Sequence, residues 1–276
     1  MKEAPRALVT GASRGIGKAI AIALAAAGFD IAIAARTVTE SDRVYDHSVS
    51  IHRPDAAPLP GSLEETARLV KGAGSRCLIV PMDLTDLDSV DDGISKVLEE
   101  WGVIQAVVNN GRHIGPGIAD TILDTPLQQF NLFLLAHGIA PIRIAQRMLP
   151  GMLAAGNGTF VTISSMAATI AYPTRPPGRG GSGLAYRMAK AAGHTLAGSL
   201  LVEHAQHGIR AFNVDPGRVL TERNTGELAA LGFDPSQYAS PRTVAAVVAW
   251  LATSPDAHKF LGADVMAQQV AIDEDL

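Results

Sequence analysis

Short apolar runs alternate with longer stretches of helical periodicity along the whole chain. Most of these runs are continuous rather than alternating, which is typical of strands covered by helices on both faces. The pattern predicts strands at residues 6–9, 30–34, 77–81, 106–108, 158–164, 209–214 and 263–267. It predicts helices at about residues 15–27, 63–73, 87–101, 127–154, 186–207 and 241–253.

This repeated β-α order predicts an α/β fold built on a single doubly wound, Rossmann-type parallel sheet of seven strands, with helices on both faces. Capping signals support two of the helices, because Ser62 is followed by Glu65 and Asp86 stands at a helix start. In sheets of this kind, ligands bind at the carboxyl ends of the strands.

Two segments interrupt the pattern. Residues 37–61 contain three prolines and several charges, and residues 171–183 (AYPTRPPGRGGSG) are rich in proline, glycine and arginine. The β-α order resumes after each, so we interpret both as loops inserted into one domain spanning residues 1–276. Loops of this length at the ligand edge of a sheet often form or cover a pocket.

Composition narrows the classes of function. With 276 residues, of which 47% are hydrophobic and 18% charged, the chain has enough apolar residues for a sizeable core. The single Cys77 excludes an internal disulfide and a cysteine-based zinc cluster, and fits a reducing compartment. His47 and His52 lie near Asp42 and Asp46, but their spacing matches no regular zinc pattern, so no metal site is expected.

Charge and hydropathy point to a cytoplasmic protein. The net charge of −4 argues against binding to nucleic acid or to an anionic membrane. No apolar run reaches the ~18 residues that span a bilayer, and no signal-like segment precedes the first expected strand. We therefore expect no nucleic-acid partner and no membrane partner.

A glycine-rich turn, Thr10-Gly11-Ala12-Ser13-Arg14-Gly15-Ile16-Gly17, follows the first expected strand and opens a helix. Glycines permit a tight turn and let the backbone approach a pyrophosphate, whose charge the helix N-terminus favours. The turn resembles the TGxxxGxG turn of the short-chain dehydrogenase/reductase family, and the resemblance extends over nearly the whole chain. The cofactor contacts expected here are Gly11, Ser13, Arg14, Gly15, Ile16 and Gly17.

The end of the second expected strand bears on the choice between NAD and NADP. NAD-dependent enzymes usually place a carboxylate there for the ribose hydroxyls, whereas this chain has Ala35 followed by Arg36. A guanidinium pairs well with a 2′-phosphate, and Arg14 is close enough in sequence to reach the same group. NADP(H) is therefore expected and NAD(H) is less favoured, with solvated surface arginines as the alternative. Asp83 and Leu84 resemble the family's adenine-contacting pair.

Tyr186 and Lys190 form a YxxxK motif, and a spacing of four places both side chains on one face of a helix. A free tyrosine, with a pKa near ~10, is a poor base at neutral pH. A neighbouring ammonium stabilises the phenolate and lowers that pKa, so this pair is the expected acid/base centre. The alternative is a helix that merely carries a partly buried tyrosine.

The family resemblance assigns further roles. It implies that Ser165, rather than Ser164, hydrogen-bonds the reacting oxygen of the substrate. The cofactor contacts that it implies outside the glycine turn and Arg36 are Asp83, Leu84, Asn109, Asn110, Gly111, Tyr186, Lys190, Pro216, Gly217, Val219 and Thr221.

Two positions depart from the family pattern. Arg112 replaces a small residue, and it contacts phosphate or substrate, or else points to solvent. His137 falls where the family has an asparagine that holds a water of the proton relay. An imidazole both donates and accepts hydrogen bonds and can take that place, although a lone histidine on an apolar helix is as often structural. The 21 residues from Ser165 to Tyr186 also exceed the usual family spacing, and the excess falls on residues 171–183.

These features predict an NADP(H)-dependent oxidoreductase that interconverts a carbonyl and a secondary alcohol by hydride transfer, with tyrosine as general acid/base. The small-molecule carbonyl or alcohol substrate would lie among residues 112–117, 167–183 and 220–232. The resemblance also implies a homodimer or homotetramer. The main alternative is a catalytically weak NADP(H)-binding sensor of the same fold. A sugar-nucleotide epimerase fits poorly, because such relatives need an added C-terminal domain.

Overall fold

A parallel sheet forms the centre of the computed structural model, which describes residues 3–42, 48–54, 58–224 and 234–276. The sheet has the seven parallel strands that the sequence predicts, and their order is β3-β2-β1-β4-β5-β6-β7. The strands are β1 (Arg6–Thr10), β2 (Asp30–Ala35), β3 (Cys77–Pro81), β4 (Ala106–Asn109), β5 (Gly158–Ile163), β6 (Ile209–Asp215) and β7 (Asp264–Met266).

Small and β-branched side chains fill the middle of this sheet. Leu8 of β1 stands between Ala32 of β2 and Val107 of β4, and all three are fully buried. Every residue of β5 is buried as well. This two-sided burial explains why the strands appear in the sequence as continuous apolar runs.

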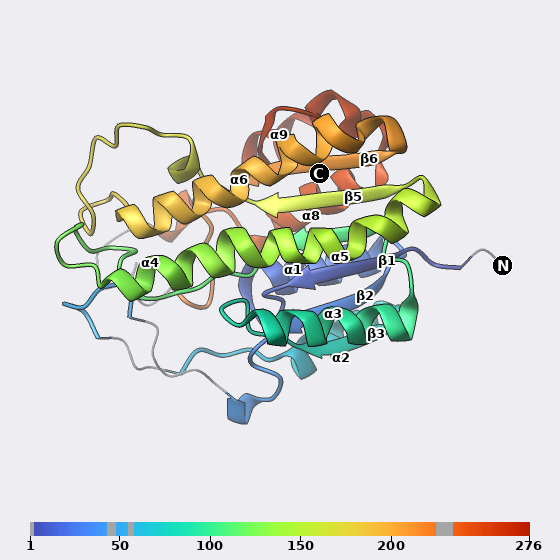
Figure 1. Cartoon of the computed structure of the whole chain (residues 1–276), viewed down its shortest axis with the longest axis horizontal. Coiled ribbons are helices and arrows are strands. Elements are labelled where there is room, and N and C mark those ends of the chain that lie inside the picture. Colours follow the sequence, from blue (N-terminus) through green and yellow to red (C-terminus); the bar gives the residue numbers. More distant parts are fainter. Residues whose placement is uncertain (1–2, 43–47, 55–57, 225–233) are drawn as a thin grey trace.

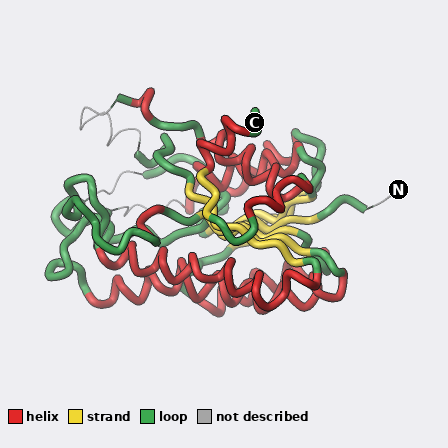
Figure 2. The backbone as a smooth tube through the Cα atoms, turned by 90° about the horizontal axis from the view of Figure 1, so that it is seen from above, coloured by secondary structure: helices red, strands yellow, loops and turns green. Residues whose placement is uncertain are grey.

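Helices cover both faces of the sheet, as Figure 2 shows. The α-helices are α1 (Gly15–Ala26), α2 (Leu63–Gly72), α3 (Leu87–Trp101), α4 (Leu127–Leu134), α5 (Ala140–Ala155), α6 (Leu184–His204), α8 (Pro241–Thr253) and α9 (Ala267–Asp273). One apolar core joins α1, α2, α8 and α9 to the sheet, and a second core joins α3, α5 and α6 to its other face. The two expected caps are present: the Ser62 side chain accepts from the Glu65 N–H, and Asp86 accepts from Asp88 and Ser89.

The expected single helix over residues 127–154 is wrong in one respect. A π-helical segment, Leu135–Ile139, separates α4 from α5. Pro141 explains the break, because it has no N–H to donate to the carbonyl of His137 four residues earlier. His137 therefore lies in a π segment, which is a form of helix often found at functional sites.

The long loops gather where the strands end. In Figure 1 the strand arrows point toward the side on which these loops lie. Residues of both inserted segments meet a stretch near Asp120: Ala119 N–H donates to the Val49 carbonyl, and Gly183 N–H donates to the Ile118 carbonyl. The carboxylate of Asp120, which is buried, accepts from Ser50 and from two backbone N–H groups. None of the described helices is both long and apolar enough to cross a bilayer.

Candidate active site

A cleft of about 460 Å³ lies at the carboxyl ends of the strands. It brings together most of the predicted site residues, namely Gly11, Ser13, Arg14, Gly15, Ile16, Gly17, Arg36, Asp83, Leu84, Asn110, Gly111, Ser165, Tyr186, Lys190, Pro216, Gly217, Val219 and Thr221. Asn109 and His137 do not line this cleft. They line a smaller cavity next to it, which shares Ser164 and Lys190 with the cleft.

Two of the three glycines in the glycine turn leave no room for a side chain. A Cβ on Gly11 would lie 2.6 Å from the Cα of Gly111, and one on Gly17 would lie 2.3 Å from the carbonyl oxygen of Gly11. The side chain of Asn110 holds the turn by donating to the carbonyls of Thr10 (2.9 Å) and Gly11 (3.2 Å). The close packing of the turn therefore requires glycine at these two positions, beside the N-terminus of α1.

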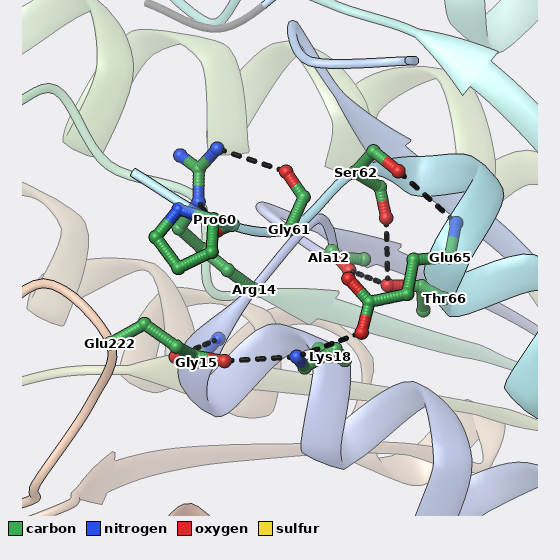
Figure 3. Close-up of polar contacts among 10 residues, drawn as sticks. All are labelled: Ala12, Arg14, Gly15, Lys18, Pro60, Gly61, Ser62, Glu65, Thr66 and Glu222. Carbon is green, nitrogen blue, oxygen red and sulfur yellow. Dashed lines mark hydrogen bonds and ion pairs between the residues drawn. The ribbon is translucent and has the colours of Figure 1, made fainter. Parts of the chain in front are cut away.

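Arg14 ties this turn to the end of the first inserted segment. Its guanidinium donates to the carbonyl of Pro60 (2.9 Å) and to that of Gly61 (3.2 Å), as Figure 3 shows. A Cβ on Gly61 would lie 2.5 Å from the Ser13 carbonyl oxygen, so the two segments are in close contact. The inserted segment therefore forms one wall of the cleft beside the turn.

A carboxylate that the motifs did not reveal lies on the same turn. Glu222 accepts a hydrogen bond from the Gly15 N–H (3.0 Å) and pairs with Lys18 (2.9 Å), which also lies 3.5 Å from Glu65 (Figure 3). Burial alone would raise the pKa of Glu222, but Lys18 and the backbone N–H groups outweigh it and the pKa lies below its ordinary value. Glu222 is thus an anion at the start of α1.

Arg36 stands at the end of β2 with 42% of its side chain exposed. Asp83, after the neighbouring strand β3, places its Oδ2 3.8 Å from this guanidinium. The other oxygen, Oδ1, accepts from the N–H (2.9 Å) and the hydroxyl (2.7 Å) of Thr85. The end of β2 itself carries no carboxylate, and the acid beside Arg36 comes from the segment that follows β3.

Ser165, Tyr186 and Lys190 meet at the inner end of the cleft. Tyr186 and Lys190 project from α6, with the ammonium 5.9 Å from the centre of the phenol ring. Lys190 donates to the carbonyl of Ile163 at the end of β5 (2.7 Å). The Ser165 hydroxyl is close enough to Tyr186 to help lower the pKa of that phenol, and it accepts from the Ala167 N–H to cap the short 3-10 turn that follows β5.

Electrostatics favour proton exchange by Tyr186. Burial would raise the pKa of this phenol, but Lys190, Arg112 and the hydrogen bond from Ser165 together bring it below its ordinary value. The pKa of Lys190 is also lowered, chiefly because burial disfavours the ammonium, although Tyr186 partly offsets this effect. Each group therefore titrates closer to neutrality than it would in water.

His137 lies behind this cluster and is almost completely buried. Its Nε2 accepts the backbone N–H of His113 (3.1 Å), and its Nδ1 has no hydrogen-bond partner among the described residues. Its ring meets that of Tyr186 edge-on at 5.9 Å. Burial, with help from Lys190 and Arg112, holds the pKa of His137 well below its usual range, so the imidazole is neutral at neutral pH.

The remaining residues of interest are Arg112, His113 and the predicted positions that the structure does not describe. Arg112 is exposed and lines the cleft, which fits each of the alternatives given for it: contact with phosphate, contact with substrate, or exposure to solvent. His113, which no motif indicated, also lines the cleft and hydrogen-bonds Gln129 (2.9 Å). Asp46, His47 and residues 225–232 of the expected substrate wall lie outside the described residues.

Comparison with known proteins shows to which family this chain belongs. A family model described as short chain dehydrogenase matches residues 5–61, and one described as Enoyl-(Acyl carrier protein) reductase matches residues 56–268. The chain belongs to the short-chain dehydrogenase/reductase family. The 2-(R)-hydroxypropyl-CoM dehydrogenase of Xanthobacter autotrophicus is 32% identical over 216 residues, which are 78% of this chain and 74% of that protein.

Two further relatives differ in how fully they align. The Dehydrogenase/reductase SDR family protein 7-like of Anopheles gambiae is 29% identical over 82% of this chain, but the match spans only 62% of that protein. The crystal structure of L-sorbose reductase from Gluconobacter frateurii, complexed with NADPH and L-sorbose, superposes with a TM-score of 0.74. It is 25% identical, with 96% of this chain and 95% of that chain covered.

Proposed function

We propose that this chain is an NADP(H)-dependent oxidoreductase that interconverts a carbonyl and a secondary alcohol. The observation that carries the proposal is the meeting of Ser165, Tyr186 and Lys190 at the inner end of a cleft. The other end of the same cleft holds a glycine turn and the exposed Arg36. A proton-exchanging pair and an anion-binding turn in one cleft are what hydride transfer with a dinucleotide requires.

The residues present fit a nicotinamide dinucleotide. Gly11 and Gly17 leave no space for a Cβ in the turn that opens α1, so a pyrophosphate would lie at the N-terminus of this helix. When bound, the cofactor supplies or accepts the hydride. Ser165 would orient the substrate oxygen by a hydrogen bond, Tyr186 would give or take the proton there, and Lys190 would keep the pKa of that tyrosine low.

The preference for NADP(H) over NAD(H) rests on Arg36. Its partner Asp83 is 3.8 Å away and is already hydrogen-bonded by Thr85, so the guanidinium has donors to spare for a 2′-phosphate. Arg14 lies in the same cleft and adds a second positive charge. The L-sorbose reductase that this chain resembles was crystallised with NADPH.

We also propose a homodimer or homotetramer in the cytoplasm. Exposed apolar side chains on the α4–α5 face, among them Leu127, Ile139 and Ile142, support an interface there. Cys77 is half-buried, and burial raises the pKa of its thiol to about 11, which keeps it unreactive.

Oxidation of NADPH and of NADH, followed in absorbance with panels of ketones, quinones and sugars, tests this proposal. We expect NADPH to be consumed faster than NADH. Tyr186→Phe should bind NADPH with the affinity of the wild type yet lose about a hundredfold or more in turnover. Full activity in Tyr186→Phe would refute the assignment, and NADPH binding without any turnover by the wild type would favour the sensor alternative.

A further inference from the structure

A chain of three polar side chains runs from the active-site cleft to the protein surface. The Ser164 hydroxyl lies 2.7 Å from Nδ1 of His194, and Nε2 of the same ring lies 3.1 Å from Oδ1 of Asp264. The three residues come from the end of β5, from α6 and from β7. A hydrogen bond on Nδ1 and an ion-pair contact on Nε2 place the imidazole between the hydroxyl and the carboxylate.

The two ends of the Ser164–His194–Asp264 chain face different surroundings. Ser164 is buried and lines both the cleft and the small cavity. Asp264 has 47% of its side chain exposed, and that of His194 is 22% exposed. The chain therefore connects the interior of the site to bulk solvent.

The small cavity connects the inner end of this chain to the proposed acid/base pair. Lys190 lines it, one helical turn before His194 on the same side of α6. Both polar side-chain atoms of Asn109, and Nδ1 of His137, are buried in its wall without a hydrogen-bond partner among the described residues. A polar cavity with room for about one water and several unpaired polar groups is where a buried water binds.

We propose that the Ser164–His194–Asp264 chain conducts protons between solvent and the Tyr186–Lys190 pair, with one water in the small cavity completing the path. This inference rests on the proposed function. The Ser164–His194–Asp264 chain would give protons a route out of the active site besides the cleft itself. This route ends at the edge of the sheet that β7 forms.

Protons balance along this path. In the reducing direction Tyr186 gives its proton to the substrate oxygen, and the Tyr186–Lys190 pair regains one from the cavity water. Ser164 then reprotonates the water, and His194 passes its Nδ1 proton to Ser164. Asp264 takes a proton from solvent and gives it to Nε2, so one proton enters for each one consumed and the net charge of the path is unchanged. His194 is then in its other tautomer, and a turn of the ring that exchanges its two nitrogens restores the starting state before the next turnover. Oxidation of an alcohol would run the same steps outward.

Titratable groups lie on each element that neighbours His194: Lys190 on α6, Asp215 on β6, Asp264 on β7 and His137 on the π segment. The side chain of Asn213 donates to the backbone carbonyl of His194 (2.8 Å), which holds this part of α6 against β6. Of these groups, Asp264 contacts the ring itself, 3.1 Å from Nε2.

Variants of His194 test the route. Steady-state turnover, its pH profile and the single-turnover rate of hydride transfer would be compared for wild type, His194→Ala, Asp264→Asn and the control His204→Ala. His204 is on the same helix, pairs with its neighbour Glu203, contacts the ring of His207 and does not line the cleft. We expect His194→Ala to lose about tenfold in turnover with an unchanged single-turnover rate, and millimolar imidazole to restore it, because a diffusible base can replace a missing carrier. Asp264→Asn should shift the pH profile, and His204→Ala should match the wild type.

Two results would overturn the route. The first is unchanged turnover in His194→Ala, and the second is a loss that imidazole does not restore. An inactive wild type would overturn the proposed function and this route with it, whereas an active wild type with an unaffected variant overturns the route alone. Nitrogen-15 NMR of the protein without cofactor gives an independent readout: Ser164→Ala should shift Nδ1 of His194, and an unshifted signal contradicts the geometry.

Discussion

Glu222 occupies the place where the dinucleotide's pyrophosphate is expected, so replacing it should tighten cofactor binding. Its carboxylate accepts from Gly15 N–H at 3.0 Å and pairs with Lys18 at 2.9 Å, directly at the start of α1. A helix N-terminus favours one anion at a time, and a bound pyrophosphate would have to displace this one. Glu222→Gln removes the charge but keeps the shape of the side chain.

The size of the effect follows from these two contacts. Glu222 and Lys18 are 28% and 21% exposed, so their pairing is partly screened and contributes about 1 kcal/mol. The charged hydrogen bond to the Gly15 N–H contributes about 1.5 kcal/mol, of which glutamine keeps about 1 kcal/mol as a neutral bond. Displacing glutamine instead of glutamate should therefore cost about 1.5 kcal/mol less, which is about tenfold in the dissociation constant.

Fluorescence titration with NADPH measures this constant, and stopped-flow mixing gives the association and dissociation rates. Glu65→Gln is the matched control, because Glu65 also faces Lys18, at 3.5 Å, but does not contact Gly15. We expect tenfold tighter binding in Glu222→Gln and little change in Glu65→Gln. Weaker binding in Glu222→Gln would refute the reasoning, since it would mean that the carboxylate supports the cofactor instead of competing with it.

Two further predictions concern packing around the site. Gly193→Ala should destabilise the fold by about 1–3 kcal/mol, because its Cβ would lie 2.2 Å from the carbonyl oxygen of His137. Gly198 is on the same helix, and a Cβ there would have no atom within 4 Å, so Gly198→Ala should instead stabilise the fold by about 0.5–1 kcal/mol. Urea denaturation measures both free energies of unfolding, and equal effects of the two substitutions would contradict the prediction. Asp120→Asn should loosen the inserted segment at Ser50. Three donors bind the two carboxylate oxygens of Asp120, and an amide keeps only one of these acceptors. Limited proteolysis should then cut this segment faster in Asp120→Asn than in Asp124→Asn. Equal rates would show that the hydrogen bonds of Asp120 do not hold the inserted segment in place.

Burial on both faces made the sheet predictable from the sequence. The strands came within one or two residues of their observed bounds because short continuous apolar runs between turn residues are typical of strands with both faces covered. The final helix α9 was missed, since its seven residues are too few to show a helical period. The break at Leu135–Ile139 was missed because apolar periodicity continues through it, although Pro141 was a visible signal.

Motifs within one segment were predictable, whereas contacts between distant segments were not. The glycine turn, Arg36 and the Tyr186–Lys190 pair line one cleft, as their order along the chain implied. The contact of Glu222 with Gly15 joins residues 207 positions apart, and no local pattern indicates it. The contact between Asp83 and Arg36 also joins two separate segments. It forms because parallel pairing of β2 with β3 brings the two strand ends together.

The departures from the family pattern lie on one side of the site, and they bear on how protons reach it. His137 stands where the resemblance expects a relay asparagine, yet burial keeps its imidazole neutral, so it orders a neighbour without carrying a charge. Tyr186, Lys190 and His194 recur at intervals of four along α6, which aligns a phenol, an ammonium and an imidazole on one face. Of the two histidines only His194 has a partly exposed ring, and each of its nitrogens contacts a polar side chain, whereas Nδ1 of His137 has no hydrogen-bond partner among the described residues. A histidine that exchanges protons with solvent needs such exposure, so the altered side of this site fits a relocated outlet at His194 better than a new carrier at His137.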